Sequence, residues 1–99
     1  MVHMLDVRQT AEYTAWFNSL RDRSVQARLT VRVRRLQEGN PGQHRVLNAG
    51  VAEMKIDVGP GYRVYYTRRG MQLILLLVGG DKTTQQTDIE TAIRLAKEI

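Results

Sequence analysis

A Gly59-Pro60-Gly61 break constrains the fold of this chain more than any other feature. Apolar and polar residues alternate on both sides of it, over residues 53–58 and 62–69. Such alternation is typical of strands that bury one face, and glycine and proline between two such runs predict a β-hairpin. With a three-residue loop at the break, Asp57 would lie opposite Arg63.

The two faces of the predicted hairpin differ in their chemistry. Successive side chains of a strand point to opposite sides of the sheet, so one side collects apolar residues alone. These are Met54, Ile56, Val58, Tyr62, Val64 and Tyr66. The other side is polar and pairs Asp57 with Arg63, Lys55 with Tyr65, and Glu53 with Thr67. We therefore expect the apolar side to lie in the core and the polar side to carry the chemistry.

The remaining patterns predict one α+β domain over residues 1–99. We expect a small antiparallel sheet, made of an N-terminal strand and a three-stranded meander, that packs on an N-terminal helical hairpin and precedes a C-terminal helix. Trp16 and Phe17 share one helical face, which we assign to the core. The other expected elements are a strand over residues 2–8, a helix over 11–20 capped by Thr10, a second helix capped by Ser24, a loop over 38–50, a central strand over 71–78 buried on both faces, and a helix opened by a capping box at 87–90.

Composition narrows the class of protein. The chain has 99 residues and no cysteine, and its histidines are His3 and His44. These counts favour neither disulfides nor a cysteine- or histidine-based metal site, so we expect no metal and no cofactor. The longest apolar run, residues 73–78, is far shorter than the roughly 20 residues that cross a bilayer. No basic-then-apolar leader opens the chain, so we expect a cytoplasmic protein without a membrane partner.

Positive charge is concentrated in the middle of the chain. The net charge is +5, and residues 21–69 carry 11 basic and 4 acidic residues, a local net charge of +7. Because arginine dominates and binds phosphates bidentately, this balance favours an RNA or DNA partner. The candidate RNA-binding residues are Arg28, Arg32, Arg35, Arg45 and Arg68. For the three on the second helix, a solvated face and a phosphate-facing or partner-facing stripe remain alternatives.

The order of these elements resembles the RelE/HigB-like toxins of bacterial toxin–antitoxin modules over nearly the whole chain. The closer resemblance is to the branch called addiction module killer proteins, or phage Gp49-like toxins. It rests on Trp16-Phe17, residues 20–23, Gly39-Asn40, and residues 50–56, 59–66 and 76–85. The combination of these segments is specific, whereas each one alone is weak.

The resemblance implies a ribosome-dependent endoribonuclease that cuts messenger RNA, an mRNA interferase. It also implies a cognate antitoxin, often a helix-turn-helix protein of the HigA type, and a toxin–antitoxin hetero-oligomer. Arg63 matches the strand arginine that contacts the scissile phosphate in the family. Lys55 stands where this branch commonly has arginine, and Lys82 lies in the segment after the last strand, where related toxins place basic or aromatic active-site residues.

The chemistry of metal-free RNA cleavage agrees with these positions. The reaction needs a base for the 2′-hydroxyl, cations for the charge on the phosphate, and an acid for the leaving oxygen. Arg63 can only be the phosphate clamp, because guanidinium keeps its proton in proteins. Lys55 or Lys82 could act as the base, as could Glu53 or Asp57, and Tyr65 could position the substrate or act as the acid. His44 is a weaker candidate because it lies alone on a loop.

Three alternatives remain open from the residues alone. A non-catalytic RNA-binding or ribosome-binding module would need the same basic surface without a base or an acid. A degenerate toxin would bind its antitoxin but leave growth unaffected. The Asp57 and Arg63 side chains could also form only an exposed salt bridge on the sheet, worth ~0.2–1 kcal/mol.

Overall fold

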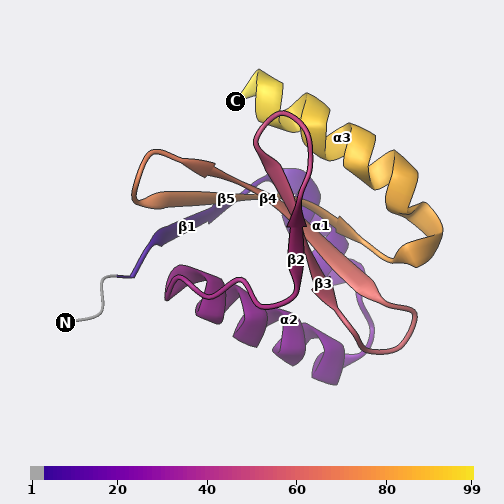
Figure 1. The fold of residues 1–99 in the computed structure, drawn as a ribbon. Helices are drawn as coiled ribbons and strands as arrows, with labels where there is room; N and C mark the ends of the chain where they lie inside the picture. Colours follow the sequence, from indigo (N-terminus) through magenta and orange to yellow (C-terminus); the bar gives the residue numbers. More distant parts are fainter. Residues whose placement is uncertain (1–3) are drawn as a thin grey trace.

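The computed structural model describes residues 4–99 and arranges them as a five-stranded sheet with helices on both faces (Figure 1). The strand order is β1-β5-β4-β3-β2. The α+β class that the sequence predicts is confirmed. The elements are β1 (Asp6–Gln9), α1 (Ala11–Ser19), α2 (Arg23–Gln37), β2 (His44–Val46), β3 (Val51–Ile56), β4 (Tyr62–Arg69), β5 (Leu73–Gly80), the short 3-10 helix η1 (Lys82–Thr84) and α3 (Gln85–Glu98).

The sheet contains the expected antiparallel meander of β3, β4 and β5, with one strand added at each edge. β1 pairs with β5 in parallel, and the first residues of the strand expected over residues 2–8 lie outside the described part of the chain. β2 pairs with β3 within residues 38–50, which we expected to be a loop. A three-residue strand with all its side chains exposed has no apolar alternation to reveal it. β5 is buried on both faces, as predicted for residues 71–78. The prediction that this strand is also the central one is wrong, because β4 lies in the middle of the sheet.

The β3–β4 hairpin has a longer turn than the sequence suggested. Ile56 lies opposite Tyr62 and Lys55 lies opposite Arg63, so the turn spans residues 57–61 and the predicted pairing is wrong by two residues. Gly59 and Gly61 both have left-handed backbone angles, which lets the chain close this wider turn. Because a shift of two residues preserves the alternation, the paired residues of β3 and β4 still lie on their predicted faces, whereas Asp57 and Val58 fall in the turn.

The first two helices begin at polar caps. The hydroxyl of Thr10 accepts a hydrogen bond from the backbone N–H of Tyr13 at 3.0 Å, as its position before α1 predicts. The cap of α2 is Asp22 rather than Ser24, since the Asp22 carboxylate accepts a hydrogen bond from the Ser24 N–H at 2.9 Å. Both helices end up on one face of the sheet, where they form the predicted helical layer.

The last helix begins earlier than the capping box at residues 87–90 predicts. The Asp81 carboxylate accepts a hydrogen bond from the Thr83 N–H at 2.8 Å and starts η1, which continues directly into α3 at Gln85. The start of α3 is therefore held close to the end of β5. None of the helices within residues 4–99 is long and apolar enough to span a membrane.

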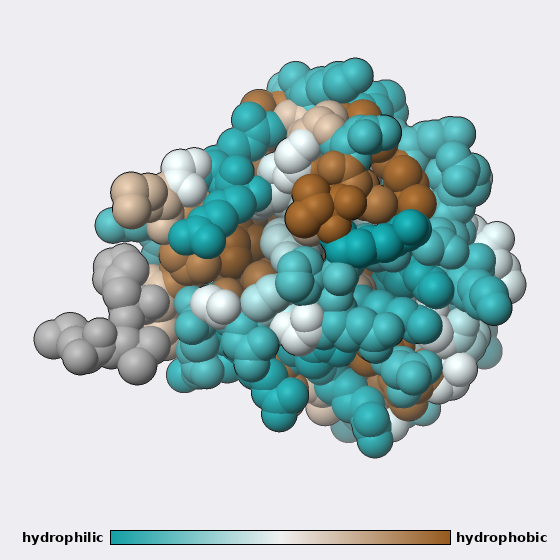
Figure 2. All heavy atoms as spheres, in the orientation of Figure 1, coloured by the Kyte–Doolittle hydropathy of each residue, from teal (hydrophilic) through white to brown (hydrophobic). Residues whose placement is uncertain are grey.

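Two apolar cores lie on opposite faces of the sheet. The core under α1 and α2 contains Tyr13, Leu29, Met54, Val64 and Leu76, with Trp16 and Phe17 packed against it half-buried. The core under α3 contains Val51, Tyr65, Leu77, Ala92 and Leu95. In Figure 1 the sheet runs between α3 above and α2 below, and Figure 2 shows that the outer surface in this view is mainly hydrophilic with separate apolar patches.

Candidate functional site

A buried carboxylate forms the centre of the polar cluster beneath α3. Glu53 is 4% exposed and accepts three hydrogen bonds. Arg45 Nε donates to Glu53 Oε1 at 2.8 Å, while the Tyr65 hydroxyl and Gln85 Nε2 donate to Oε2 at 2.9 and 3.0 Å. One carboxylate thus connects β2, β3, β4 and the first residue of α3.

Sheet register explains why these groups meet. Arg45 on β2 and Tyr65 on β4 both lie directly opposite Glu53, on either side of β3. Side chains opposite each other in neighbouring strands share a face and come within contact distance. Gln85 completes the set because η1 turns the chain back over the sheet before α3 begins.

Hydrogen bonding keeps the Glu53 carboxylate ionised. Burial raises the pKa of Glu53, but hydrogen bonds from Arg45, Gln85 and Tyr65 together outweigh it, so the pKa lies below the usual value of 4.5. Burial raises the pKa of Tyr65, and the hydrogen bond to Glu53 and the negative charge of Glu53 raise it further. At neutral pH the Tyr65 hydroxyl therefore keeps its proton and donates a hydrogen bond to the Glu53 carboxylate.

Arg63 lies at the edge of this cluster and is 7% exposed. Its Nη1 donates to the Gly61 carbonyl at 2.9 Å, and its Nε lies 3.8 Å from Glu53 Oε2 without a hydrogen-bond partner. The expected pair with Asp57 is wrong, because the shorter strands leave Asp57 in the turn. Hydrogen bonds from Thr83 lower the pKa of Asp81, and the charge of Arg63 adds to that effect. The buried guanidinium thus retains an unused donor near the Glu53 carboxylate.

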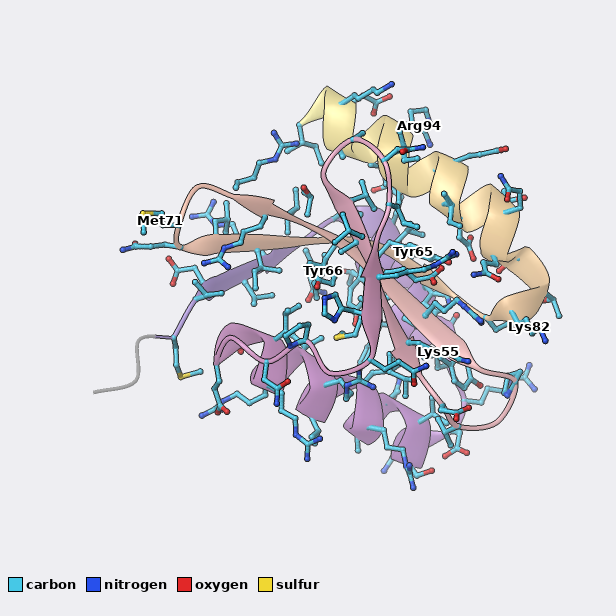
Figure 3. The ribbon with its side chains drawn as sticks, viewed as in Figure 1. Lys55, Tyr65, Tyr66, Met71, Lys82 and Arg94 are labelled. Carbon is cyan, nitrogen blue, oxygen red and sulfur yellow. The ribbon has the colours of Figure 1, made fainter. Side chains whose placement is uncertain are left out.

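Three positive side chains gather at this end of the sheet, and we call Lys55, Arg63 and Lys82 the cationic rim. Lys55 lies directly opposite Arg63, which in turn lies opposite Gly80, two residues before Lys82. Figure 3 shows Lys55 and Lys82 on the same side of the molecule, near the turn between β3 and β4. Since like charges placed opposite each other destabilise a sheet, this pairing does not serve stability.

The five arginines predicted to bind RNA do not form one surface. Arg45 belongs to the Glu53 cluster, and Arg28 and Arg35 lie on α2 beside Arg32. Arg32 is occupied by backbone carbonyls, since its Nη1 donates to Lys55 O at 2.7 Å and its Nη2 to Pro41 O at 3.0 Å. Arg68 lies at the other end of β4, where its Nη2 donates to Met71 O at 3.1 Å.

The structure adds two groups that sequence reasoning missed. Gln85 reaches Glu53, and Asp81 lies within the electrostatic influence of Arg63. No local pattern could have identified them, because a single glutamine or aspartate in a polar segment has no periodicity. His44 is exposed on β2 and its Nδ1 lies 2.9 Å from Gly42 O, beside a hollow of about 100 Å³ that Glu53 also lines. Within residues 4–99, no three histidine, aspartate or glutamate side chains are grouped to hold a metal ion.

Comparison with known proteins identifies the family. The family described as "Phage derived protein Gp49-like" matches residues 15–99. An uncharacterized protein of Haemophilus influenzae is 39% identical over 95 residues, which cover 96% of each chain. No solved structure matches the chain. The chain therefore belongs to the phage-derived Gp49-like family, which is associated with toxin–antitoxin modules.

Proposed function

We propose that this protein is a RelE/HigB-like toxin of a toxin–antitoxin module and cuts messenger RNA on the ribosome without a metal ion. The observation that carries the proposal is the placement of Lys55 directly opposite Arg63, at the end of the sheet where β5 leads to Lys82. A small domain gains nothing in stability from such a pairing. An RNA phosphate would neutralise these charges, and the family association with toxins supports this substrate.

The burial of Glu53 and Tyr65 suggests that they act as positioning residues. All three neighbouring donors already occupy the Glu53 carboxylate, and the Tyr65 side chain is fully buried. A carboxylate that is 4% exposed and already accepts three hydrogen bonds is poorly placed to take a proton from a substrate. We therefore assign to Glu53 and Tyr65 the placement of Arg45 and Arg63, and to the cationic rim the contact with RNA.

In the proposed reaction, the 2′-oxygen attacks the adjacent phosphorus while one of Lys55 and Lys82, in its neutral amine form, accepts its proton. The bond from phosphorus to the 5′-oxygen breaks, that oxygen takes a proton from the ammonium of the other lysine, and a 2′,3′-cyclic phosphate remains. Arg63 stabilises the charge that develops on the phosphate oxygens. The site lacks a histidine pair, so we expect the ribosome to hold the RNA in line, an effect worth up to about 7–11 kcal/mol in the best intramolecular cases.

The decisive experiment compares cleavage of a messenger in a stalled ribosome with cleavage of the same naked messenger. We expect the wild-type protein to cut the ribosome-bound RNA and to bind naked RNA in a salt-dependent way with little cleavage. Chelator in the naked-RNA reactions should change nothing. Equal cutting of both substrates would refute ribosome dependence, and loss of cutting with chelator would refute the metal-free mechanism.

Variants of the cationic rim test the residue roles in the same assay. Arg63→Lys keeps the charge of a buried side chain and loses the two-pronged contact, so we expect cleavage to fall at least 100-fold. Arg63→Ala would in addition leave a cavity, because the side chain is buried. Lys55→Ala and Lys82→Ala should each reduce cleavage, whereas Lys97→Ala at the end of α3 serves as the control. Full activity of Arg63→Lys in a folded protein contradicts the assignment.

The near-complete burial of Arg63 favours one alternative, a module that binds RNA or the ribosome without cutting it. Such a protein would block translation while the messenger stays intact. A degenerate toxin would bind its antitoxin and leave both translation and growth unchanged. Translation and cleavage measured in the same reaction separate these three functions.

A further inference from the structure

A second surface feature lies outside the Glu53 cluster, along α2. It is a groove of about 340 Å³ between α2 and the start of the β3–β4 turn. Its lining residues are Ala27, Arg28, Val31, Arg32, Arg35, Ile56 and Asp57. The α2 residues recur at intervals of three and four, so they form one stripe along about two turns of the helix.

The floor of this groove is apolar. Ile56 is buried beneath it, and Val31 remains 48% exposed although it lies in the middle of α2. Ala27, one turn before Val31, leaves space for close approach. In Figure 2 apolar atoms show between hydrophilic ones in the lower part of the view, where Figure 1 places α2. An exposed apolar floor within a polar rim is typical of a docking surface.

The rim of the groove is positively charged and partly rigid. Arg28 and Arg35 are exposed and enter no ion pair among residues 4–99. Arg32 between them is held by the carbonyls of Lys55 and Pro41. Burial lowers the pKa of Arg32, and the charge of Arg35 on the same stripe lowers it further. The acidic lining residue is Asp57, across from the helix.

We propose that this groove docks an acidic amphipathic helix of a partner protein. The spacing of Arg28 and Arg35 places two guanidinium groups roughly 10 Å apart along α2, a distance that two carboxylates seven residues apart on a second helix would match. Apolar side chains between those carboxylates would rest on Val31. A helix laid against a stripe at this spacing is a common mode of peptide recognition.

The lining favours a protein helix over RNA. Single-stranded RNA is usually bound by aromatic side chains that stack on its bases, and none lines this groove. The floor instead offers Ala27, Val31 and Ile56, which suit aliphatic side chains. The proposal is independent of nuclease activity, because it concerns a different face of the molecule from the cationic rim.

The test uses backbone amide NMR of the whole protein with a synthetic probe. The probe is a 16-residue helical peptide with a leucine stripe flanked by glutamates at seven-residue spacing, and its control is a scrambled peptide of the same composition. We expect saturable shifts confined to the amides of residues 27–35 and 56–57. Arg28→Glu and Val31→Asp should each weaken binding at least tenfold.

Arg34→Glu is the matched control variant. Arg34 lies on α2 with its side chain 65% exposed, pairs with Glu38 and does not line the groove, so it makes the same charge change elsewhere on the helix. Its peptide affinity should stay within twofold of the wild type, and amide dispersion confirms the fold of every variant. Equal weakening by Arg34→Glu, equal binding of the scrambled peptide, or no binding at millimolar peptide overturns the proposal. So does a ten-nucleotide RNA that shifts these amides when the peptide does not.

Discussion

The two faces of the sheet differ in what they bury beneath their helices. The face under α1 and α2 is apolar along its length, with Met54, Ile56 and Val64 from the central hairpin. The face under α3 is apolar near Val51 and then becomes polar at Glu53. Buried polar groups cost free energy unless they are fully hydrogen-bonded, and an apolar face would have served stability alone. The polar end of the α3 face is the place where we propose that RNA binds.

Two adjacent glycines at the end of β5 show the same contrast at close range. A Cβ atom added at Gly79 would overlap the Trp16 ring on the α1 face, and one added at Gly80 would overlap the Asp88 carboxylate on the α3 face. Burial raises the pKa of Asp88, a hydrogen bond from Thr84 opposes this, and the charge of Asp81 adds to the increase. The missing side chain of Gly79 thus leaves room for the Trp16 ring, and that of Gly80 leaves room for the Asp88 carboxylate.

The largest expected effect concerns the aromatic contact on the α1 face. Trp16→Ala should lower the free energy of unfolding by roughly 3–4 kcal/mol, near the low end for aromatic truncation because the ring is half-buried. Gly79→Ala should cost roughly 1–3 kcal/mol by overpacking against the same ring. Urea denaturation of both single variants and of the double variant measures their coupling.

In the double variant the alanine at position 79 no longer meets the indole ring. We therefore expect the cost of Gly79→Ala to shrink in the Trp16→Ala background. Additive costs would show that the ring does not explain the requirement for Gly79. If Trp16→Ala melted like wild type but lost RNA binding, the assignment of this face to the core would be wrong.

The next largest loss of stability is expected at the polar end of the α3 face. Glu53→Gln removes the charge that faces Arg45 and Arg63 while keeping the shape of the side chain, and we expect a loss of roughly 2–3 kcal/mol at pH 7. Glu90→Gln, on the exposed side of α3, changes the same charge and should cost less than about 0.5 kcal/mol. Urea denaturation at pH 7 gives both values.

The same variant predicts a pH dependence. Because the pKa of Glu53 is lowered in the folded state, its contribution to stability is complete above the unfolded value of 4.5 and is lost as the pH falls through the folded value. The stability difference between wild type and Glu53→Gln should therefore narrow on acidification below about pH 4.5. A difference that stayed constant down to pH 3 would contradict an ionised Glu53.

Local patterns explain how much of the fold could be predicted. Alternation around residues 59–61 assigned the paired hairpin residues to their correct faces. The i, i+4 spacing of Val25 and Leu29 is typical of one helical face, and in α2 that face is the buried one. The register was wrong because loop length depends on where the strands stop pairing, which alternation does not encode. β2 was missed because its three residues are all exposed.

The candidate site was predictable in its residue types but not in its burial. Glu53, Tyr65 and Arg63 were found from their shared polar face, but alternation alone did not indicate that all three are buried. The path of α3 across the sheet decides their burial, and that path depends on η1 and on Gln85, which carry no sequence signal. Long-range contacts of this kind connect residues 32 positions apart in the chain.

The smallest expected loss of stability comes from removing a tyrosine hydroxyl, and Tyr65 and Tyr66 on opposite faces of β4 allow a comparison. Tyr65→Phe removes one of the three hydrogen bonds to Glu53 and should cost about 1–2 kcal/mol, whereas the Tyr66 hydroxyl makes no hydrogen bond within residues 4–99 and Tyr66→Phe should cost less than about 0.5 kcal/mol. Since the Tyr65 hydrogen bond helps to lower the pKa of Glu53, its loss should raise that pKa toward 4.5. Carboxyl-carbon NMR titration should then detect an upward shift in Tyr65→Phe and none in Tyr66→Phe. Equal costs in the two variants, or an unchanged Glu53 titration in Tyr65→Phe, would mean that the polar end of the α3 face is not organised around this carboxylate.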